Sequence, residues 1–153
     1  MNFLELRIPP VAQVLICGAA MWWLAVQFPA TGFNLAASGY LAAGLAVVAL
    51  ATGLAAVARF RRAGTTVNPV DPGQASQVVT NGVYRFSRNP MYLGLLLLLT
   101  AWALWLANLA TLPVLPGFVL YMNRFQIQPE ERFLALKFGE DFHRYRESVR
   151  RWL

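Results

Sequence analysis

Near the middle of the chain, a basic, polar segment passes directly into a long apolar one. The segment reads Gly82-Val83-Tyr84-Arg85-Phe86-Ser87-Arg88-Asn89-Pro90-Met91-Tyr92-Leu93-Gly94. Pro90 lacks the N–H that the first residue of a helix leaves unpaired, so it fits the first helical position, and Asn89 fits the N-cap before it. The free N–H groups and positive dipole end of this helix then face Arg85 and Arg88. We therefore predict an anion-binding corner where an apolar helix begins.

A second candidate group is the acidic pair Glu130-Glu131, which follows Pro129. Proline with acidic residues behind it is also ordinary chemistry for a helix start. Successive helical positions are about 100° apart, so we expect only one of the two glutamates to face the Arg88–Tyr92 pocket. Arg124, shortly before the pair, is our candidate for binding a carboxylate of cofactor or substrate.

Several kinds of catalysis are excluded by residue counts. The chain has one cysteine, Cys17, inside an apolar segment, and one histidine, His143, on a charged tail. It therefore lacks the ligands for a metal cluster and the partners for a serine or cysteine triad. Methyl transfer from a sulfonium needs none of these groups, because the enzyme mainly has to align a nucleophile with the methyl group and exclude water.

The order of these motifs resembles the isoprenylcysteine carboxyl methyltransferase and phospholipid methyltransferase group of integral membrane enzymes. The resemblance covers roughly the C-terminal half, and includes Phe138-Gly139 behind the glutamates. It implies S-adenosylmethionine as cofactor, a lipid or lipophilic acceptor, and catalytic roles for Arg124, Glu130 and Glu131. The cofactor-binding residues that it implies are Tyr84, Arg85, Arg88, Asn89, Pro90, Tyr92, Gly94, Glu130 and Glu131. The isoprenylcysteine enzymes usually have histidine where this chain has Asn89, so the superfamily is better supported than that substrate.

Two other classes of function remain open on the sequence. Membrane sterol reductases share an Arg-X-X-X-Tyr motif, here Arg88 to Tyr92, but use a nicotinamide cofactor. A small membrane protein that kept the fold without catalysis is the third class. Pro90 inside the motif and the paired glutamates favour methyl transfer.

Composition indicates a membrane protein with a single domain over residues 1–153. Hydrophobic residues make up 58% of the chain and charged residues 13%, more apolar than a soluble core needs. The net charge of +6 accompanies apolar spans, so we expect anionic lipid headgroups, and not nucleic acid, as the partner of the basic residues.

The expected fold is all-α and integral to the membrane, with about four transmembrane helices. The spans are residues 11–28, 35–57, 91–106 and 112–125, of which the last contains two prolines and is the shortest. Four spans place all thirteen Lys and Arg residues on one side, which predicts a multi-pass protein with both termini cytoplasmic, as in a bacterial inner membrane. We expect the second span, rich in Ala and Gly, to pack centrally.

Two segments outside the spans complete the prediction. The polar stretch 63–87 is interpreted either as a lid or floor for a site at the cytoplasmic surface or, in its first half, as a flexible linker. Residues 129–153 form amphipathic helices broken near Gly139. Their apolar stripe consists of Leu134, Phe138, Phe142, Tyr145, Val149 and Trp152.

Overall fold

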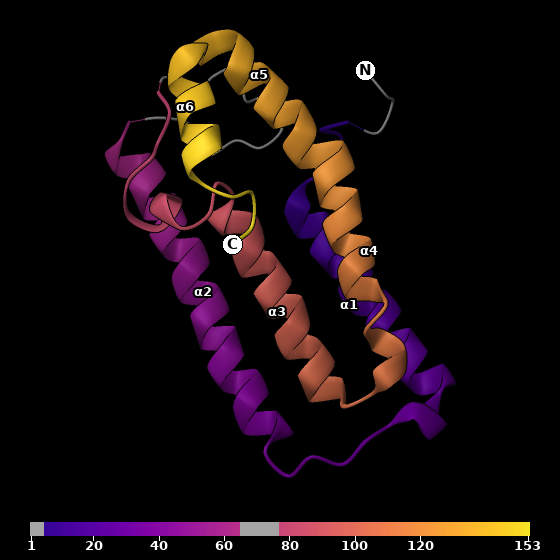
Figure 1. Ribbon diagram of the computed structural model, residues 1–153. Coiled ribbons are helices and arrows are strands. Elements are labelled where there is room, and N and C mark those ends of the chain that lie inside the picture. The colour runs from indigo at the N-terminus through magenta and orange to yellow at the C-terminus, as the bar shows by residue number, and fades with distance from the viewer. Residues whose placement is uncertain (1–4, 65–76) are drawn as a thin grey trace.

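The computed structural model describes residues 5–64 and 77–153, and within these ranges all regular elements are helical. The long helices run side by side, and the chain folds back at one end of them through a short helix near the C-terminus (Figure 1). The α-helices are α1 (Pro10–Gln27), α2 (Ser38–Arg62), α3 (Pro90–Leu106), α4 (Val114–Tyr121), α5 (Gln128–Phe138) and α6 (Glu140–Ser148). Short 3-10 turns are η1 (Pro29–Thr31), η3 (Gly82–Arg85) and η4 (Leu109–Thr111), and η5 (Met122–Ile127) is a π-helical segment. The all-α prediction is confirmed.

Two of these helices, α1 and α2, are long and apolar enough to cross a membrane by length and composition. Large apolar side chains are exposed along both, including Leu15 and Ile16 on α1 and Val47 and Leu54 on α2. Apolar surface of this extent is expected to face hydrocarbon and not water. The third apolar helix, α3, has 17 residues.

The central helix is α3 and not α2. It packs against α1, α2 and α4, and its closest approach is to α2. A Cβ added at Gly94 would lie 2.9 Å from the Ala49 carbonyl oxygen and 3.2 Å from the Gly53 nitrogen. The prediction that the second span packs centrally is therefore wrong, because its small residues serve a single close contact with α3.

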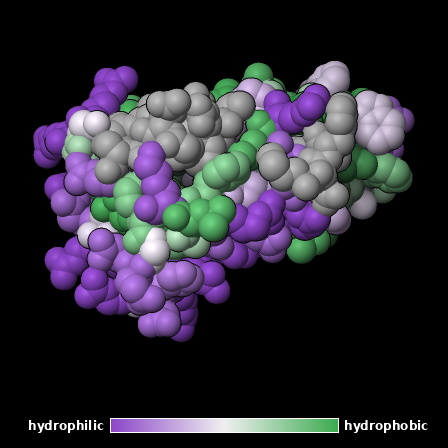
Figure 2. Space-filling model, turned by 90° about the horizontal axis from the view of Figure 1, so that it is seen from above, coloured by the Kyte–Doolittle hydropathy of each residue, from purple (hydrophilic) through white to green (hydrophobic). Residues whose placement is uncertain are grey.

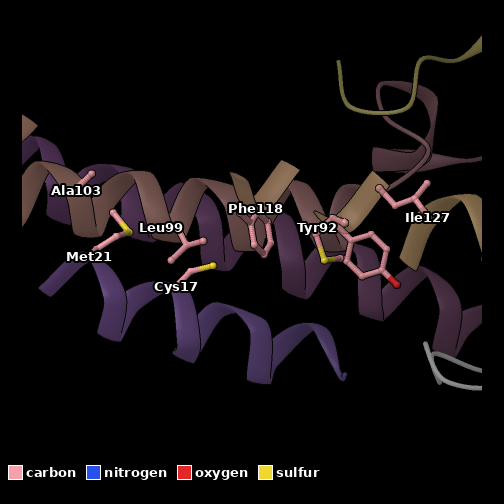
Figure 3. Packing of buried hydrophobic residues seen from close by; sticks show 8 residues of the cluster. Cys17, Met21, Tyr92, Leu99, Ala103, Phe118 and Ile127 are labelled. Carbon is pink, nitrogen blue, oxygen red and sulfur yellow. The ribbon is translucent and has the colours of Figure 1, made fainter. Parts of the chain in front are cut away.

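The core lies where α1, α3 and α4 meet (Figure 3). Cys17 and Met21 from α1 pack against Leu99 of α3 and Phe118 of α4, and all four side chains are buried. Cys17 thus packs as a small apolar side chain of the core. The ring of Tyr92 also belongs to this cluster, while its hydroxyl points away from the other labelled side chains.

α4, η5 and α5 form one continuous helical run from Val114 to Phe138, seen in Figure 1 as a single curved rod. The prediction that Pro129 starts a new helix is therefore wrong. In an α-helix the carbonyl of Phe125 would accept from residue 129, but proline has no N–H. The π-turn accommodates this loss, and the N–H of Leu6 donates to the Phe125 carbonyl instead, at 3.0 Å. Glu130 and Glu131 therefore lie within a continuous helical run and not at a helix start with free N–H groups.

The tail folds back over the end of the bundle as the apolar stripe predicts. α5 ends before Gly139, whose φ of +51° suits glycine, and α6 starts directly after it. Phe142 and Tyr145 of α6 are buried against Val79 and Tyr84. Figure 2 looks down on this end, where hydrophilic side chains surround apolar patches. Residues 65–76 of the predicted lid or linker lie outside the described residues.

Candidate active site

A pocket of about 420 Å³ opens where the start of α3 meets α5 and α6. Its polar side chains come from η3, from the start of α3 and from α5, and its apolar walls come from α1, α2 and α3. Gln77, Val78 and Val79 close one side, so the end of the long polar loop contributes to the wall. Predicted site residues that line the pocket are Tyr84, Arg88, Asn89, Tyr92, Glu130 and Glu131. The structure therefore brings two sequence motifs about forty residues apart into one site.

Arg88 and Glu131 form a buried ion pair at the polar end. Arg88 Nη2 lies 2.8 Å from Glu131 Oε1, with the side chains only 11% and 12% exposed. Arg151 Nη2 lies 2.6 Å from the other carboxylate oxygen, so one carboxylate holds two guanidinium groups. Arg88 Nη1 also donates to the carbonyl of Arg146 at 2.8 Å and to that of Val149. The Arg88 guanidinium is therefore fixed in one geometry by three acceptors, two carbonyls of the tail and the Glu131 carboxylate of α5.

Glu130, which precedes Glu131 in the sequence, belongs to a second polar cluster. It accepts hydrogen bonds from the hydroxyl of Tyr92 and from Nε2 of Gln126. Gln126 Nε2 also lies 3.4 Å from the Tyr92 hydroxyl, which closes a triangle of buried polar groups. Both glutamates line the pocket, so the expectation that only one of them faces it is wrong. The pocket is wrapped by α3 on one side and by the tail on the other, so side chains 100° apart reach different parts of one site.

The segment after α6 is tied to the start of α3. The backbone N–H of Arg88 donates to the Arg150 carbonyl at 2.9 Å. Ser87 Oγ and Asn89 Nδ2 both donate to the Arg151 carbonyl, at 3.2 and 3.0 Å. Asn89 thus precedes Pro90 at the N-cap position as predicted, but its side chain makes no capping hydrogen bond. It holds the tail against the helix start instead.

Four of the predicted site residues lie elsewhere. Arg124 pairs with the buried carboxylate of Glu5 at 3.0 Å and does not line the pocket. Gly94 faces α2, Pro90 is buried at the helix start, and Arg85 is exposed on η3. Of the two arginines in the predicted anion-binding corner, Arg88 lines the pocket and Arg85 does not.

Three residues that contribute hydrogen bonds in and around the site were not predicted from the sequence. Gln126 stands one helical turn before Glu130, a spacing that suggests a polar pair. Arg151 was grouped with the basic residues that contact lipid, and Tyr145 was counted as part of an apolar stripe. The Tyr145 hydroxyl donates to the Tyr84 carbonyl at 2.7 Å, and burial raises the pKa of both tyrosines well above the usual range.

The two glutamates differ in proton affinity. Burial raises the pKa of Glu130 to about 7, although hydrogen bonds from Tyr92 and Gln126 oppose the shift. Burial would also raise the pKa of Glu131, but hydrogen bonds from Arg151 and Arg88 outweigh it and lower the pKa below its usual value. Glu130 therefore exchanges a proton near neutral pH, while Glu131 stays ionised.

This difference predicts how stability depends on pH. Between about pH 4.5 and 7 the folded protein keeps a proton on Glu130 that the unfolded chain has lost. The free energy of unfolding should therefore fall as pH rises through this window, by on the order of 3 kcal/mol in total. Glu130→Gln should abolish this fall. Thermal unfolding of both proteins in detergent at about pH 5 and about pH 8 measures it, and equal pH dependence in the two would contradict the assignment.

Apolar helices around a charged pocket define a helical membrane protein with a site at one end of its bundle. Comparison with known proteins agrees: the model of the phospholipid methyltransferase family matches residues 37–141. The chain belongs to the phospholipid methyltransferase family, and its methyltransferase chemistry on lipids is that of the family. A protein of Haemophilus influenzae described as uncharacterized is 56% identical over 64 residues, which are 41% of this chain and 100% of the relative. No solved structure matches the chain.

Proposed function

We propose that the protein transfers a methyl group from S-adenosylmethionine to a lipophilic acceptor, such as an isoprenylcysteine-like carboxylate or a phospholipid-like amine. The observation that carries the proposal is the pocket that joins the Arg88 and Glu130 motifs. It combines charged groups of both signs with apolar walls from α1, α2 and α3. Such a site can hold a zwitterionic cofactor beside an apolar substrate.

The residues present fit this cofactor. Its carboxylate matches Arg88, whose buried Nε has no hydrogen-bond partner among the described residues. Its cationic amino group and ribose hydroxyls match the carboxylate of Glu130, which can accept hydrogen bonds from them. The aromatic side chains Tyr84 and Phe60, with ring centroids 5.2 Å apart, offer a stacking surface for the adenine ring.

The chain's own residues supply position and proton handling. When bound, the cofactor would provide a methyl group activated by its sulfonium sulfur, and the acceptor's lone pair would form a bond to the methyl carbon as the carbon–sulfur bond breaks. The apolar walls keep water away from this carbon. A carboxylate acceptor has no proton to lose, whereas an amine must give one up. Glu130, deprotonated above its pKa of about 7, can accept that proton at its carboxylate oxygen.

Calorimetry with S-adenosylhomocysteine tests the proposal directly. We expect saturable binding to the purified protein with one site per chain. The same titration with a nicotinamide dinucleotide should give no heat, which separates methyl transfer from the reductase alternative. Binding of the nicotinamide compound alone would overturn the proposal, and binding of neither would favour a protein without catalysis.

We also propose four membrane spans, formed by α1, α2, α3 and the run that starts with α4, with the site at the cytoplasmic surface. The basic residues support this arrangement, because Arg7, the five arginines from the last turn of α2 to the start of α3 and the seven basic residues from Arg124 onward then share one side. The turn around η1 lies at the opposite end (Figure 1).

This topology predicts where a thiol reagent can react. In a Cys17→Ser background, a single cysteine placed at Ala30 should be labelled from outside the cell by a membrane-impermeant maleimide. A cysteine at the exposed Arg61 should be labelled only after the membrane is broken. The opposite pattern would invert the topology, and labelling of both from outside would show that α2 does not cross the membrane.

A further inference from the structure

A second cavity, of about 540 Å³, runs between α1 and α2 over the surface of α3. All its lining residues are apolar or glycine, so unlike the first pocket it has no charged side chain. From α1 they are Val14, Leu15, Gly18, Ala19 and Trp22, from α2 Ala42, Ala43 and Ala46, and from α3 Leu98, Leu99, Ala101, Trp102 and Trp105. We call this cavity the apolar groove.

Small side chains in the walls leave the space that forms the groove. Gly18 on one wall and Ala46 on the other leave room that larger residues would fill, and a Cβ added at Gly18 would meet no atom within 4 Å. Trp102 donates its Nε1 hydrogen to the Gly18 carbonyl at 3.1 Å, so its polar atom is satisfied and its ring forms an apolar surface. The groove is therefore shaped for hydrocarbon.

The groove continues from the site. Val11 of α1 and Leu95 of α3 line the charged pocket, and Val14 and Leu98, one turn further along the same helices, line the groove. Along α1 the walls of the charged pocket and the groove together extend from Val11 to Trp22, which at 1.5 Å per residue is about 16 Å. An extended hydrocarbon chain advances about 1.3 Å per carbon, given its bond length and angle, so about twelve carbons fit.

We propose that the groove binds the single aliphatic chain of the acceptor, with the reacting headgroup in the charged pocket. This inference rests on the proposed function and narrows its substrate class to one-chain lipophiles. The bilayer already solvates such a chain, so burial in the groove adds no hydrophobic driving force. The groove selects by shape, and it aligns the headgroup because the chain is held between α1, α2 and α3.

The test fills the groove from either wall. Ala46→Phe and Gly18→Leu should each lower kcat/KM at least about tenfold for a tetradecyl acceptor, while a hexyl acceptor reacts as before. Ala51→Phe, on the exposed surface of α2 outside the groove, is the matched control and should react normally with both. The probes are S-alkyl-N-acetylcysteines for a carboxylate acceptor and alkylamines for an amine acceptor. S-adenosylhomocysteine binding should be unchanged in every variant.

The outcomes separate this inference from the proposed function. Wild-type protein that does not bind S-adenosylhomocysteine would refute the proposed function itself. If it binds the cofactor but methylates no one-chain probe, the substrate class is wrong. Equal reaction of both chain lengths in the filled variants would show that the groove holds only bulk lipid. Loss with both chain lengths and intact cofactor binding would show that filling disturbs the charged pocket, which also overturns the inference.

Discussion

Arg88→Ala should weaken S-adenosylhomocysteine binding by about 1.5–3 kcal/mol, the scale of a hydrogen bond to a charged group. That corresponds to roughly a tenfold to hundredfold rise in Kd. The reason is geometric: Arg88 is 11% exposed, its guanidinium is held by Glu131 and two tail carbonyls, and its Nε is buried in the pocket wall. Calorimetry of the purified variant measures the change.

Arg61→Ala is the control for this prediction. Arg61 lies in the last turn of α2 and is exposed, so its removal should leave cofactor affinity nearly unchanged. Arg88→Lys keeps the positive charge but loses the planar fork, and it should fall between alanine and wild type. Equal effects at positions 88 and 61 would mean that surface charge has been mistaken for a site. Thermal unfolding identifies any variant that fails to fold.

Conversion to glutamine should lower mainly the stability of the protein at Glu131 and mainly its activity at Glu130. Glu131→Gln removes the carboxylate shared by Arg88 and Arg151, and breaking a buried ion pair costs roughly 3–5 kcal/mol of stability. Glu130→Gln leaves no buried cation behind, so stability should be kept and should no longer fall as pH rises. Activity of Glu130→Gln should drop at least about tenfold, or about 1.4 kcal/mol in the barrier, because the carboxylate facing the cofactor is lost.

Paired measurements of unfolding and turnover distinguish these roles. A Glu130→Gln protein with full turnover and cofactor affinity would remove Glu130 from the site. A Glu131→Gln protein with unchanged stability would show that the two arginines do not depend on its charge. Arg151→Ala should reproduce part of the Glu131 effect on stability, since its side chain is more exposed than that of Arg88.

Local sequence signals predicted several elements because their causes are local. The apolar lengths predicted α1, α2 and α3, Pro90 predicted the first residue of α3, and Gly139 predicted the break between α5 and α6. Each depends on the backbone properties of a few neighbouring residues. The family resemblance, confirmed by the match over residues 37–141, rests likewise on short motifs in a fixed order.

Long-range contacts explain the predictions that were wrong. Arg124 was assigned to the site, yet it pairs with Glu5, which lies 119 residues away in the chain and also holds Arg132 at 2.7 Å. The assignment of Pro129 to a helix start failed because the N–H of Leu6, from the other end of the chain, satisfies the Phe125 carbonyl. No local pattern can indicate such partners.

The sequence by itself determined the helical class, the positions of the apolar helices and the motifs that carry the family. Only the tertiary structure decided that Glu130 and Glu131 both face one pocket, that Arg151 shares Glu131 with Arg88, and that α3 is the central helix. Helix formation depends on neighbours within a turn or two. Which partner a charged side chain contacts depends on how the tail and the bundle enclose it. A buried charge must be paired, and only the fold decides which group lies beside it.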